Sequence, residues 1–493
     1  MTQGPIRSLW LSASIILILL VVLNVPSIPT SEASQLYDLV ISNGRVIDPE
    51  SKTDAVLNLG VLNGTIRVIT KDVLRGRNVI DARGLVVSPG FIDLHQHGQD
   101  DENYRFKAMD GVTSALELEV GTGDIDRWYS EREGRTLINY GVSVGHLAAR
   151  MAAMKERVTF LPTGEAARRA ATNDEIAEMK QTLKHGLERG AVAVGFGLQY
   201  IPNASPWEVL EMFRVAARFG ATCHVHLRHA GANEASGSVQ ALEEVIADAA
   251  ITGAPLHVVH IASTGGPTTT KLLQMIAEAK SRQLDITTEC YPYTAGMTEI
   301  KSAIFDEGWQ NVFGIDYKDL LWAATGERLT KESFARYRQT GGMVAVFSMT
   351  DEIVAEAVRS PLTMIASDGI LEKGKGHPRT AGTFSRVLGH YVREQATLTL
   401  MEALNKMTLM PAQRLEKRVP AMRKKGRIQV GADADIVAFN LGLVNDRSTY
   451  QEPARYSEGM RFVVVNGVPV VKDGQLQTSV HPGRPIRAPY RQK

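Results

Sequence analysis

The chain has few cysteines, since only Cys223 and Cys290 occur among its 493 residues. A structural zinc site built from several thiolates is therefore excluded. Each cysteine lies in a stretch that the sequence predicts to be a buried strand, so we interpret both as unreactive thiols of the protein core. An oxidising compartment would permit a disulfide between them, but the sequence does not place one.

The charged residues show no excess of either sign. Lysine and arginine number 55, aspartate and glutamate number 54, and the formal net charge is +1. This balance gives no general electrostatic reason to expect a nucleic acid or an acidic surface as a partner. We therefore expect a small-molecule substrate and no nucleic acid. With 44% hydrophobic and 22% charged residues, the composition is that of an ordinary globular protein and indicates no oligomeric state.

Long apolar runs are absent except for one near the N-terminus, over residues 9–25. An arginine precedes this run and small residues follow it at 31–34. This pattern is typical of a secretory signal peptide, and it predicts a signal over residues 1–33 with cleavage after Ala33. The protein is then exported, to a periplasm or outside the cell. The alternative is an uncleaved N-terminal membrane anchor, because the run is close to the length that spans a bilayer.

Both ends of the remaining chain have the pattern of short strands joined by tight turns. In residues 34–88, alternating apolar segments are separated by Asn43-Gly44 and Asn63-Gly64, a dipeptide that favours two-residue hairpins. The same pattern returns in residues 415–493, where Asn466-Gly467 follows an apolar run. Two β-rich flanks around a long middle predict a small β-sandwich domain assembled from both termini.

The middle of the chain, residues 89–414, alternates predicted strands with predicted helices. One helix begins at a capping-box pattern at residues 172–175, and another begins at Ser205-Pro206. Strands that alternate with helices indicate parallel pairing, and eight such units close a (β/α)8 barrel. We therefore predict an α/β protein with a TIM-like barrel, and insertions over the barrel mouth between residues 294 and 361. The eight strand candidates are centred on residues 91–95, 114–119, 142–146, 191–195, 222–227, 256–261, 286–291 and 364–367.

The first of these strands ends in His95-Gln96-His97. In an extended strand residues i and i+2 point to the same face, so both imidazoles can reach one metal ion. The pattern alone is weak, since two half-exposed histidines at a strand end would look the same. Ionisable residues recur at the ends of later predicted strands, however, and active sites form at the carboxyl ends of barrel strands.

Six of the eight predicted strands deliver an ionisable side chain to this rim. Buried His, Glu and Asp without partners are destabilising, so convergence on a metal ion is the simpler explanation. Glu119 is favoured over Glu117 because it lies nearer the end of its strand. His224 and His257 are interpreted as core or outward-facing residues. The predicted metal ligands are His95, His97, Glu117, Glu119, His226 and His260.

Asp368 is the predicted general base for a metal-bound water, because it lies at the end of the eighth strand just before Gly369. Several other residues near strand ends are candidates for contact with a substrate, although each could equally be an ordinary loop residue. These candidates are His146, Arg150, Tyr200, Arg228, Tyr291 and Arg379.

Blocks along the chain resemble those of the amidohydrolase superfamily. The run from Pro89 to His97 and the run at 431–437 match patterns of the whole superfamily. Gly-Leu-Gln-Tyr-Ile-Pro at 197–202 and Tyr-Pro-Tyr-Thr-Ala-Gly at 291–296 are similar to the D-aminoacylase branch, the N-acyl-D-amino-acid deacylases. The resemblance covers nearly everything from about residue 37 to 485. Further matching blocks follow in order at 145–150, 226–228, 367–369 and 377–379.

The resemblance implies a (β/α)8 barrel with a small β-sandwich, and a centre of one or two Zn²⁺ ions or another divalent metal. Asp368 would take a proton from the attacking water and pass it to the leaving amine. Arg379 and Tyr291 would face the substrate, whose carboxylate suits a guanidinium group. The ligands that it implies are His95 and His97 for the more exposed ion, and His226 and His260 for the tighter one.

Two positions depart from the pattern of that branch. The branch typically has a cysteine ligand at the end of the second strand, where this chain reads Glu117-Leu118-Glu119-Val120. Many members of the superfamily use a carboxylated lysine on the fourth strand, but residues 195–198 contain no lysine. We therefore predict a bridging glutamate, which is a harder ligand than a thiolate. The branch also usually has a lysine where this chain has Ala262, so recognition of a substrate carboxylate must differ.

We predict a metal-dependent hydrolase of a carboxamide bond that acts on N-acyl-D-amino acids or related small amides. The ion would polarise the scissile carbonyl and lower the pKa of its water toward about 7. One alternative is a cyclic amide hydrolase similar to dihydropyrimidinases. Another is a non-catalytic exported binding protein on a degenerate hydrolase frame, which the missing cysteine and lysine would support.

Overall fold

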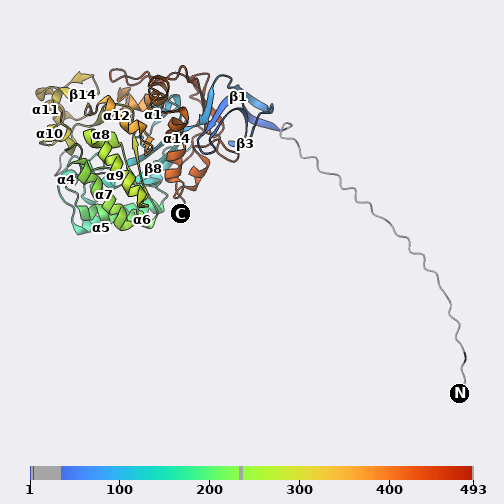
Figure 1. Ribbon diagram of the computed structural model, residues 1–493. Helices are drawn as coiled ribbons and strands as arrows, with labels where there is room; N and C mark the ends of the chain where they lie inside the picture. The colour runs from blue at the N-terminus through green and yellow to red at the C-terminus, as the bar shows by residue number, and fades with distance from the viewer. Residues whose placement is uncertain (2–3, 5–34, 233–236, 491–493) are drawn as a thin grey trace.

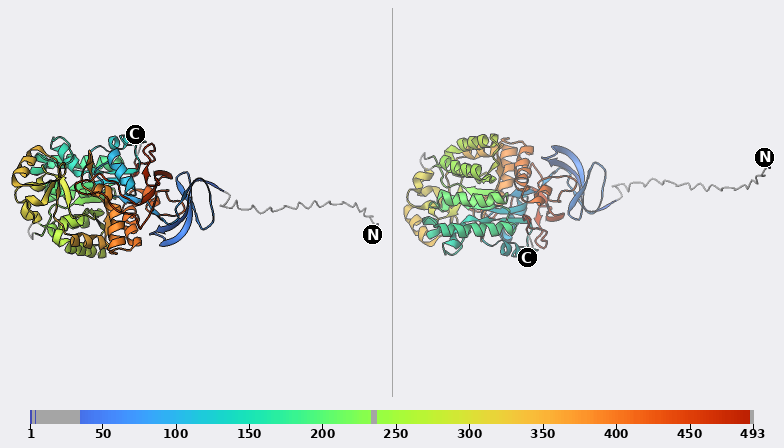
Figure 2. Two further views of the ribbon diagram at one scale, coloured as in Figure 1. Left: turned by 90° about the horizontal axis from the view of Figure 1, so that it is seen from above. Right: turned by 90° about the horizontal axis from the view of Figure 1, so that it is seen from below.

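The computed structural model describes residues 35–232 and 237–490, together with residues 1 and 4 (Figure 1). Apart from residues 1 and 4, the predicted signal segment lies outside the described residues. Within the described ranges, no helix is both long and apolar enough to cross a membrane. A barrel ringed by helices forms the larger part of the molecule, and a smaller β-rich part lies beside it (Figure 2).

Eight parallel strands form the barrel, in the order β17-β12-β11-β10-β9-β8-β7-β6. Beyond the ends of β6 and β17, Gln96 pairs with Gly369, and the amide of Asp368 donates to the carbonyl of His95 at 2.7 Å. The barrel therefore closes at the rim where the predicted site residues lie. Its strands are β6 (Phe91–Asp93), β7 (Val112–Thr122), β8 (Asn139–Gly145), β9 (Val194–Gly197), β10 (Cys223–His226), β11 (Leu256–Val258), β12 (Ile286–Cys290) and β17 (Thr363–Ile365).

Each predicted barrel strand coincides with one of these strands, which confirms the predicted barrel. The bounds of the strands differ from the predicted ranges by up to three residues. β9 begins at Val194 rather than at residue 191. β11 ends at Val258 rather than at residue 261, because the chain turns at His260, whose φ is 33°, and helix α8 (Ile261–Gly265) follows directly.

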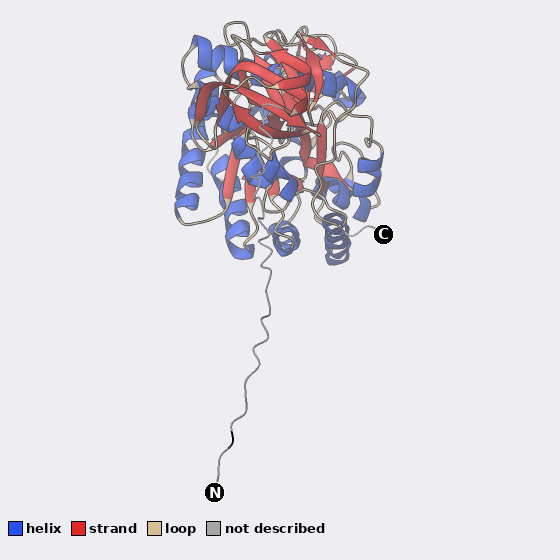
Figure 3. Ribbon diagram, turned by 90° about the vertical axis from the view of Figure 1, so that its right-hand side faces the viewer, coloured by secondary structure: helices blue, strands red, loops and turns tan. Residues whose placement is uncertain are grey.

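Helices cover the outside of the barrel (Figure 3). α5 (Asn173–Glu188) begins at the predicted capping box, where the side chains of Thr172 and Glu175 each accept from the other's backbone amide. α6 (Pro206–Arg218) begins after Ser205, whose side chain accepts from a first-turn amide. Such caps satisfy amides that a helix start leaves unpaired. The other elements of this layer are α1 (Asp101–Met109), α2 (Ile125–Ser130), α3 (His146–Ala153), α4 (Glu165–Arg168), α7 (Ser238–Thr252), α9 (Thr269–Ser281), α12 (Asp351–Arg359), α13 (Arg379–Arg386), the π-helix η6 (Val387–Glu394), α14 (Leu400–Met407) and α15 (Leu409–Leu415).

The predicted β domain is built from both ends of the chain. Its nine strands form one hydrogen-bonded sheet, in the order β23-β22-β21-β20-β5-β1-β2-β3 with β4 beside β1. Strand β5 from the N-terminal part pairs with β20 from the C-terminal part, and Ile41 and Ile436 share one apolar core. The strands are β1 (Leu36–Asp48), β2 (Thr53–Leu62), β3 (Thr65–Thr70), β4 (Arg75–Asp81), β5 (Val86–Pro89), β20 (Ile436–Phe439), β21 (Met460–Val465), β22 (Val468–Lys472) and β23 (Gln475–Leu476).

One of the predicted hairpin turns is wrong. Asn43 and Gly44 lie inside β1, a single strand of 13 residues, at the point where its register against β2 shifts. A Cβ at Gly44 would lie 2.4 Å from a methyl carbon of Val87, so only glycine fits this bulge. The other two dipeptides, Asn63-Gly64 and Asn466-Gly467, do join neighbouring antiparallel strands, as predicted.

The predicted C-terminal β segment, residues 415–493, also contributes to the barrel. The amide of Ile486 donates to the carbonyl of Tyr140 at 2.7 Å, and the carbonyl of Ile486 accepts from the hydroxyl of Tyr129 at 2.6 Å. Met422 packs in one apolar cluster with Ile92 of β6. After strands β20 to β23 of the β domain, the chain therefore returns to the barrel at Ile486.

The predicted insertion between residues 294 and 361 forms a small unit with its own sheet, in the order β13-β16-β14-β15. Trp309 stacks on Phe334 with ring centroids 5.3 Å apart, in an apolar core of this unit. The unit lies over the carboxyl-end rim, since Met297 and Val346 line the pocket described below. Its elements include β13 (Gly296–Glu299), α10 (Trp309–Phe313), β14 (Leu320–Trp322), β15 (Glu327–Arg328), α11 (Lys331–Thr340) and β16 (Met343–Val346).

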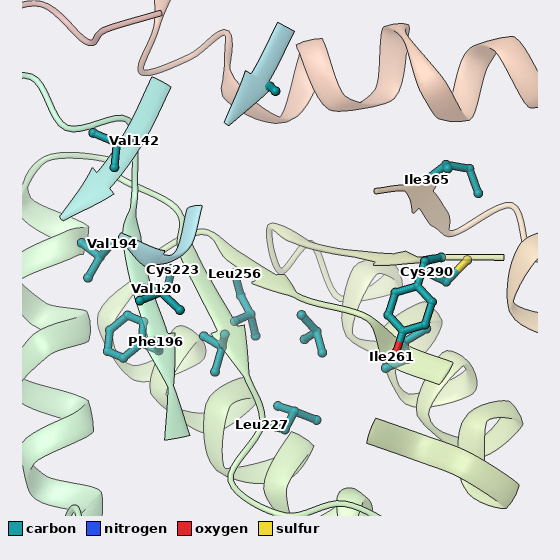
Figure 4. Packing of buried hydrophobic residues seen from close by; sticks show 14 of the residues in the cluster. Val120, Val142, Val194, Phe196, Cys223, Leu227, Leu256, Ile261, Cys290 and Ile365 are labelled. Atoms are coloured by element: carbon teal, nitrogen blue, oxygen red, sulfur yellow. The ribbon is translucent and has the colours of Figure 1, made fainter. Parts of the chain in front are cut away.

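A large apolar core fills the space around the barrel strands (Figure 4). Cys223 and Cys290 both lie in this core, and neither is in a disulfide. Burial raises the pKa of both thiols, that of Cys290 to about 12. The prediction that both thiols lie in the protein core is confirmed.

Beneath the rim, Lys107 of α1 forms a buried ion pair with Asp93 of β6, with Nζ 2.8 Å from Oδ2. We expect Lys107→Met to leave the carboxylate buried without its cation and to lower the free energy of unfolding by about 3–5 kcal/mol. The exposed pair of Arg77 and Asp38 gives a control, because Arg77→Met should change this free energy by less than about 1 kcal/mol. Urea denaturation measures both variants, and equal effects would contradict the expectation.

Candidate metal centre and active site

Glu119 of β7 lies at the middle of the site, and its two carboxylate oxygens face different histidines. Oε2 lies 2.7 Å from Nε2 of His95 and 3.3 Å from Nε2 of His97. Oε1 lies 2.8 Å from Nδ1 of His226 and 3.9 Å from Nε2 of His260. Glu119 is therefore shared by two histidine pairs, which is the arrangement that a bridging ligand requires.

The candidate ligand atoms form two groups, within each of which all atoms lie within 4.8 Å of one another. Neutral imidazole and carboxylate are donors that Zn²⁺ and similar divalent ions prefer. The donor set therefore fits a centre of one or two divalent ions. The first group contains His95, His97, Glu119 and Asp368, and the second contains Glu119, His226 and His260.

Two of these residues have a backbone conformation that side chains rarely adopt. The φ angle is 33° at His260 and 51° at Asp368. Left-handed conformations of residues other than glycine cost free energy, and they gather at functional sites. Both residues closely follow the end of a barrel strand, so the turn sets the direction in which each side chain leaves the rim.

A further carboxylate lies behind each histidine of the first pair. Oε2 of Glu117 lies 2.6 Å from Nδ1 of His97, and Oε1 of Glu289 lies 2.6 Å from Nδ1 of His95. Partners of this kind fix the orientation and tautomer of a metal-binding imidazole. Glu117 also accepts from the amide of Val120. The structure thus places Glu117 behind His97 rather than in either ligand group, contrary to the prediction.

Glu289 of β12 and Gln199 are absent from the sequence prediction. Besides His95, Glu289 faces Nε2 of His257 at 3.0 Å, which makes His257 part of a buried network. Oε1 of Gln199 lies 2.8 Å from Nε2 of His226. A glutamate in an otherwise uncharged strand was the signal for Glu119, and the same signal in residues 286–290 would have found Glu289.

Asp368 forms a buried ion pair with Arg379, in which Nη1 lies 2.9 Å from Oδ2. The other oxygen, Oδ1, lies 3.1 Å from Nε2 of His97. Burial alone would raise the pKa of Asp368, but the charges of Arg379 and His95 lower it below its ordinary value. Asp368 is therefore ionised, as a general base must be. Arg379 is only 1% exposed and lies over the ring of Tyr291, and its contact with Asp368 positions that carboxylate.

A pocket of about 60 Å³ opens beside the second ligand group. His226, His260 and Asp368 line it, and the insertion contributes apolar side chains such as Phe313. Tyr200 and Tyr291 also line this pocket, and the ring of Tyr200 packs 4.9 Å from that of His226. Of the predicted substrate contacts, these two tyrosines thus lie where a substrate bound at the metal centre would contact them.

Three other predicted substrate contacts lie away from this pocket, contrary to the prediction. His146 lies 2.8 Å from the carboxylate of Glu208, which also binds Arg150, and all three side chains are fully buried. This cluster ties α3 to α6. Arg228 pairs with Glu244 of α7 at 2.7 Å. Ionisable residues near strand ends can anchor the surrounding helices, and the sequence pattern does not separate this role from substrate binding.

The chain matches the model of the amidohydrolase family over residues 78–153 and 144–471, and it belongs to this family. It is 30% identical over 497 residues to a D-aminoacylase of Alcaligenes xylosoxydans xylosoxydans, across 92% of this chain and 98% of the relative. It is also 30% identical to an N-acyl-D-glutamate deacylase of the same organism, across 91% of this chain and 96% of the relative.

Solved structures also support the assignment of the chain to this family. The fold is similar to that of an N-acyl-D-glutamate deacylase from Bordetella bronchiseptica complexed with zinc and a phosphonate inhibitor, with a TM-score of 0.79 and 28% identity over 92% of this chain and 100% of that chain. A D-hydantoinase structure covers the same shares with a TM-score of 0.61 and 18% identity, which is a likeness of fold alone. The resemblance to the D-aminoacylase branch is confirmed.

Replacing Glu119 removes the side chain that both ligand groups share. We expect Glu119→Ala to lose at least one bound metal ion per chain after equilibration with zinc and dialysis. Glu117→Ala keeps every candidate ligand, so it should retain the metal and lower its affinity by about 10- to 100-fold. Elemental analysis gives the metal content, and competition with a chelator gives the affinity. Equal metal loss in the two variants would contradict the assignment of Glu119 as a metal ligand and of Glu117 as the residue that orients His97.

Metal binding to the first group should release protons. Burial alone would lower the pKa of His95 and of His97, but Asp368 and Glu119 beside His95, and Glu117 beside His97, raise both well above the ordinary value. Without metal, both rings are then charged near neutral pH, and each must lose a proton to bind an ion. Metal affinity should therefore fall as the pH is lowered.

Calorimetry in buffers with different ionisation heats counts these protons. We expect more than one proton per chain to be released at about pH 7.5, which exceeds what a metal-bound water alone can supply. Two histidines with an ordinary pKa of about 6.5 would together release only about 0.2 proton at that pH. A count no higher than one would show that the two pKa values are not raised.

Proposed function

We propose that this protein is a zinc-dependent hydrolase that removes the acyl group from N-acyl-D-amino acids. The observation that carries the proposal is Glu119 between two histidine pairs, with Asp368 at the mouth of the adjoining pocket. The proposal is also supported by the 30% identity between this chain, over nearly its full length, and a D-aminoacylase. The preference for the D configuration comes from that relative.

Two histidine pairs and Glu119 would hold the zinc. When bound, such an ion polarises a carbonyl oxygen and lowers the pKa of a water toward about 7. Oδ1 of Asp368 faces the ligand group and is positioned to accept the proton of the attacking water. The same carboxyl group then donates this proton to the nitrogen that leaves as an amine. Arg379 holds Oδ2, and this contact keeps Oδ1 directed at the reacting atoms.

The pocket lining favours a substrate with an uncharged side chain. Its described lining residues include no lysine or arginine, and Ala262, at the position where the branch usually has a lysine, supplies no charge. The hydroxyl of Tyr291 is buried and has no hydrogen-bond partner among the described residues, so it can donate to the substrate's carboxylate. Apolar groups such as Phe313 and Met297 complete the wall.

A panel of amides tests the proposal. We expect the zinc-loaded protein to hydrolyse N-acetyl-D-leucine and N-acetyl-D-methionine in preference to N-acetyl-D-glutamate and N-acetyl-L-leucine. Asp368→Asn should lower kcat by about 10²- to 10⁴-fold, because it removes the general base. Amine release measures turnover, and elemental analysis shows whether the variant still holds zinc.

Other outcomes of the panel point elsewhere. Ring opening of hydantoin or dihydrouracil without deacylation would favour the cyclic amide hydrolase. Ligand binding without turnover and without metal would favour a binding protein. Full turnover by a zinc-loaded Asp368→Asn protein would refute the assigned base.

A further inference from the structure

A second cavity reaches the candidate metal centre at His97. It is distinct from the pocket beside His226 and His260, because no described residue lines both. Its volume of about 450 Å³ is in the range of ligand-binding sites. We name this cavity, which is lined by His97, Trp128, Phe160 and Leu371 among others, the His97 chamber.

The walls of the His97 chamber combine polar and apolar groups, and the large apolar side chains among them include Trp128, Val158 and Phe160. The ring of Phe160 meets that of His97 edge-on, with centroids 5.1 Å apart. Val158 and Phe160, on the segment between α3 and α4, are 51% and 38% exposed. Large apolar side chains that stay exposed beside a reactive centre mark a surface that binds something apolar.

The charges around the chamber disfavour an anionic ligand. Arg132 is the single lysine or arginine among its described lining residues, and its guanidinium lies 4.0 Å from the ring centroid of Trp128. It donates to the backbone carbonyls of Gln99 and Trp128, so its hydrogen-bonding capacity is largely used. The carboxylates of Asp100, Glu117 and Glu372 also line the chamber. The apolar side chains of the chamber therefore suit an uncharged group better than an anion.

The position of Asp368 tells which half of an amide lies in which cavity. Asp368 lines the pocket beside His226 and not the His97 chamber. The leaving nitrogen must receive its proton from Asp368, so the amino-acid half lies in that pocket. The acyl half then extends past His97.

Resting on the proposed deacylase function, we propose that the His97 chamber binds the acyl chain of the substrate and selects medium to long chains over acetyl. The pocket of about 60 Å³ is the smaller of the two cavities and takes the amino-acid half, whereas the chamber has room for such a chain. The chamber also shares Thr122, Trp128 and Val158 with an adjoining surface groove of about 550 Å³. A long chain can therefore continue into the groove, and the preference should have no sharp upper limit.

The test compares N-acetyl-, N-hexanoyl- and N-decanoyl-D-leucine with the zinc-loaded protein. Each buried methylene should raise kcat/KM by up to about fourfold, so the hexanoyl substrate should exceed the acetyl substrate by at least about tenfold. Phe160→Ala removes part of the wall and should reduce the decanoyl-to-acetyl ratio at least about fivefold. A wild-type ratio of one or less would overturn the proposal.

Phe313→Ala is the matched control, because Phe313 lines the other pocket. It should lower activity on all three substrates to a similar degree and leave their ratio unchanged. If Phe313→Ala changes the chain-length ratio and Phe160→Ala does not, the two halves of the substrate lie the other way round, and the proposal is wrong.

A binding measurement separates this proposal from the proposed function. Trp128 lines the chamber, so its fluorescence should report octanamide binding to the zinc-loaded protein, with an affinity at least about 100-fold above that for acetamide. Trp128→Phe should lose the signal, and Phe160→Ala should weaken binding. Such binding without deacylation of any N-acyl-D-amino acid would refute the enzyme function alone, whereas deacylation without this binding would refute the chamber alone.

Discussion

The site depends on the burial of one carboxylate, that of Glu119. Its side chain is 2% exposed, and a buried carboxylate without partners would strongly destabilise the fold. Burial alone would raise its pKa, but the charge of His95 and the contact with His226 lower it well below the ordinary value. Glu119 stays an anion because histidines from three barrel strands face it. The closure of the rim through Gln96 and Gly369 keeps those strands in place.

Carboxylates outnumber fixed cations around this centre. Four described carboxylates face its histidines, and Arg379 is the guanidinium in contact with them, so the formal charge is −3 when the histidines are neutral. Protons on His95 and His97 compensate part of this charge, and divalent ions would compensate it instead. Proton binding and metal binding therefore oppose each other at the same nitrogen atoms. This competition links the raised pKa of both histidines to the affinity for metal.

The sequence predicts the barrel and most of the centre, and physical reasons explain where it fails. His95 and His97 are predictable because i, i+2 spacing on a strand fixes their common face. His260 and Asp368 are predictable as strand-end residues, but their left-handed backbone is not, since it depends on how the rim closes. Arg228 and Arg379 pair with carboxylates distant in sequence, and no local pattern shows that such a partner exists.

A glutamate in place of a cysteine changes what the shared ligand can do. In the branch that this chain resembles, the cysteine offers one sulfur atom. Glu119 carries the same single charge but offers two oxygens, and each faces its own pair of histidines. Each pair can therefore hold an ion with an oxygen of its own, and the two ions need not share one ligand atom. Because a carboxylate is also a harder donor than a thiolate, the exchange would favour harder metal ions than a thiolate does. The exchange would thus keep the charge of the shared ligand, while giving each histidine pair an oxygen of its own.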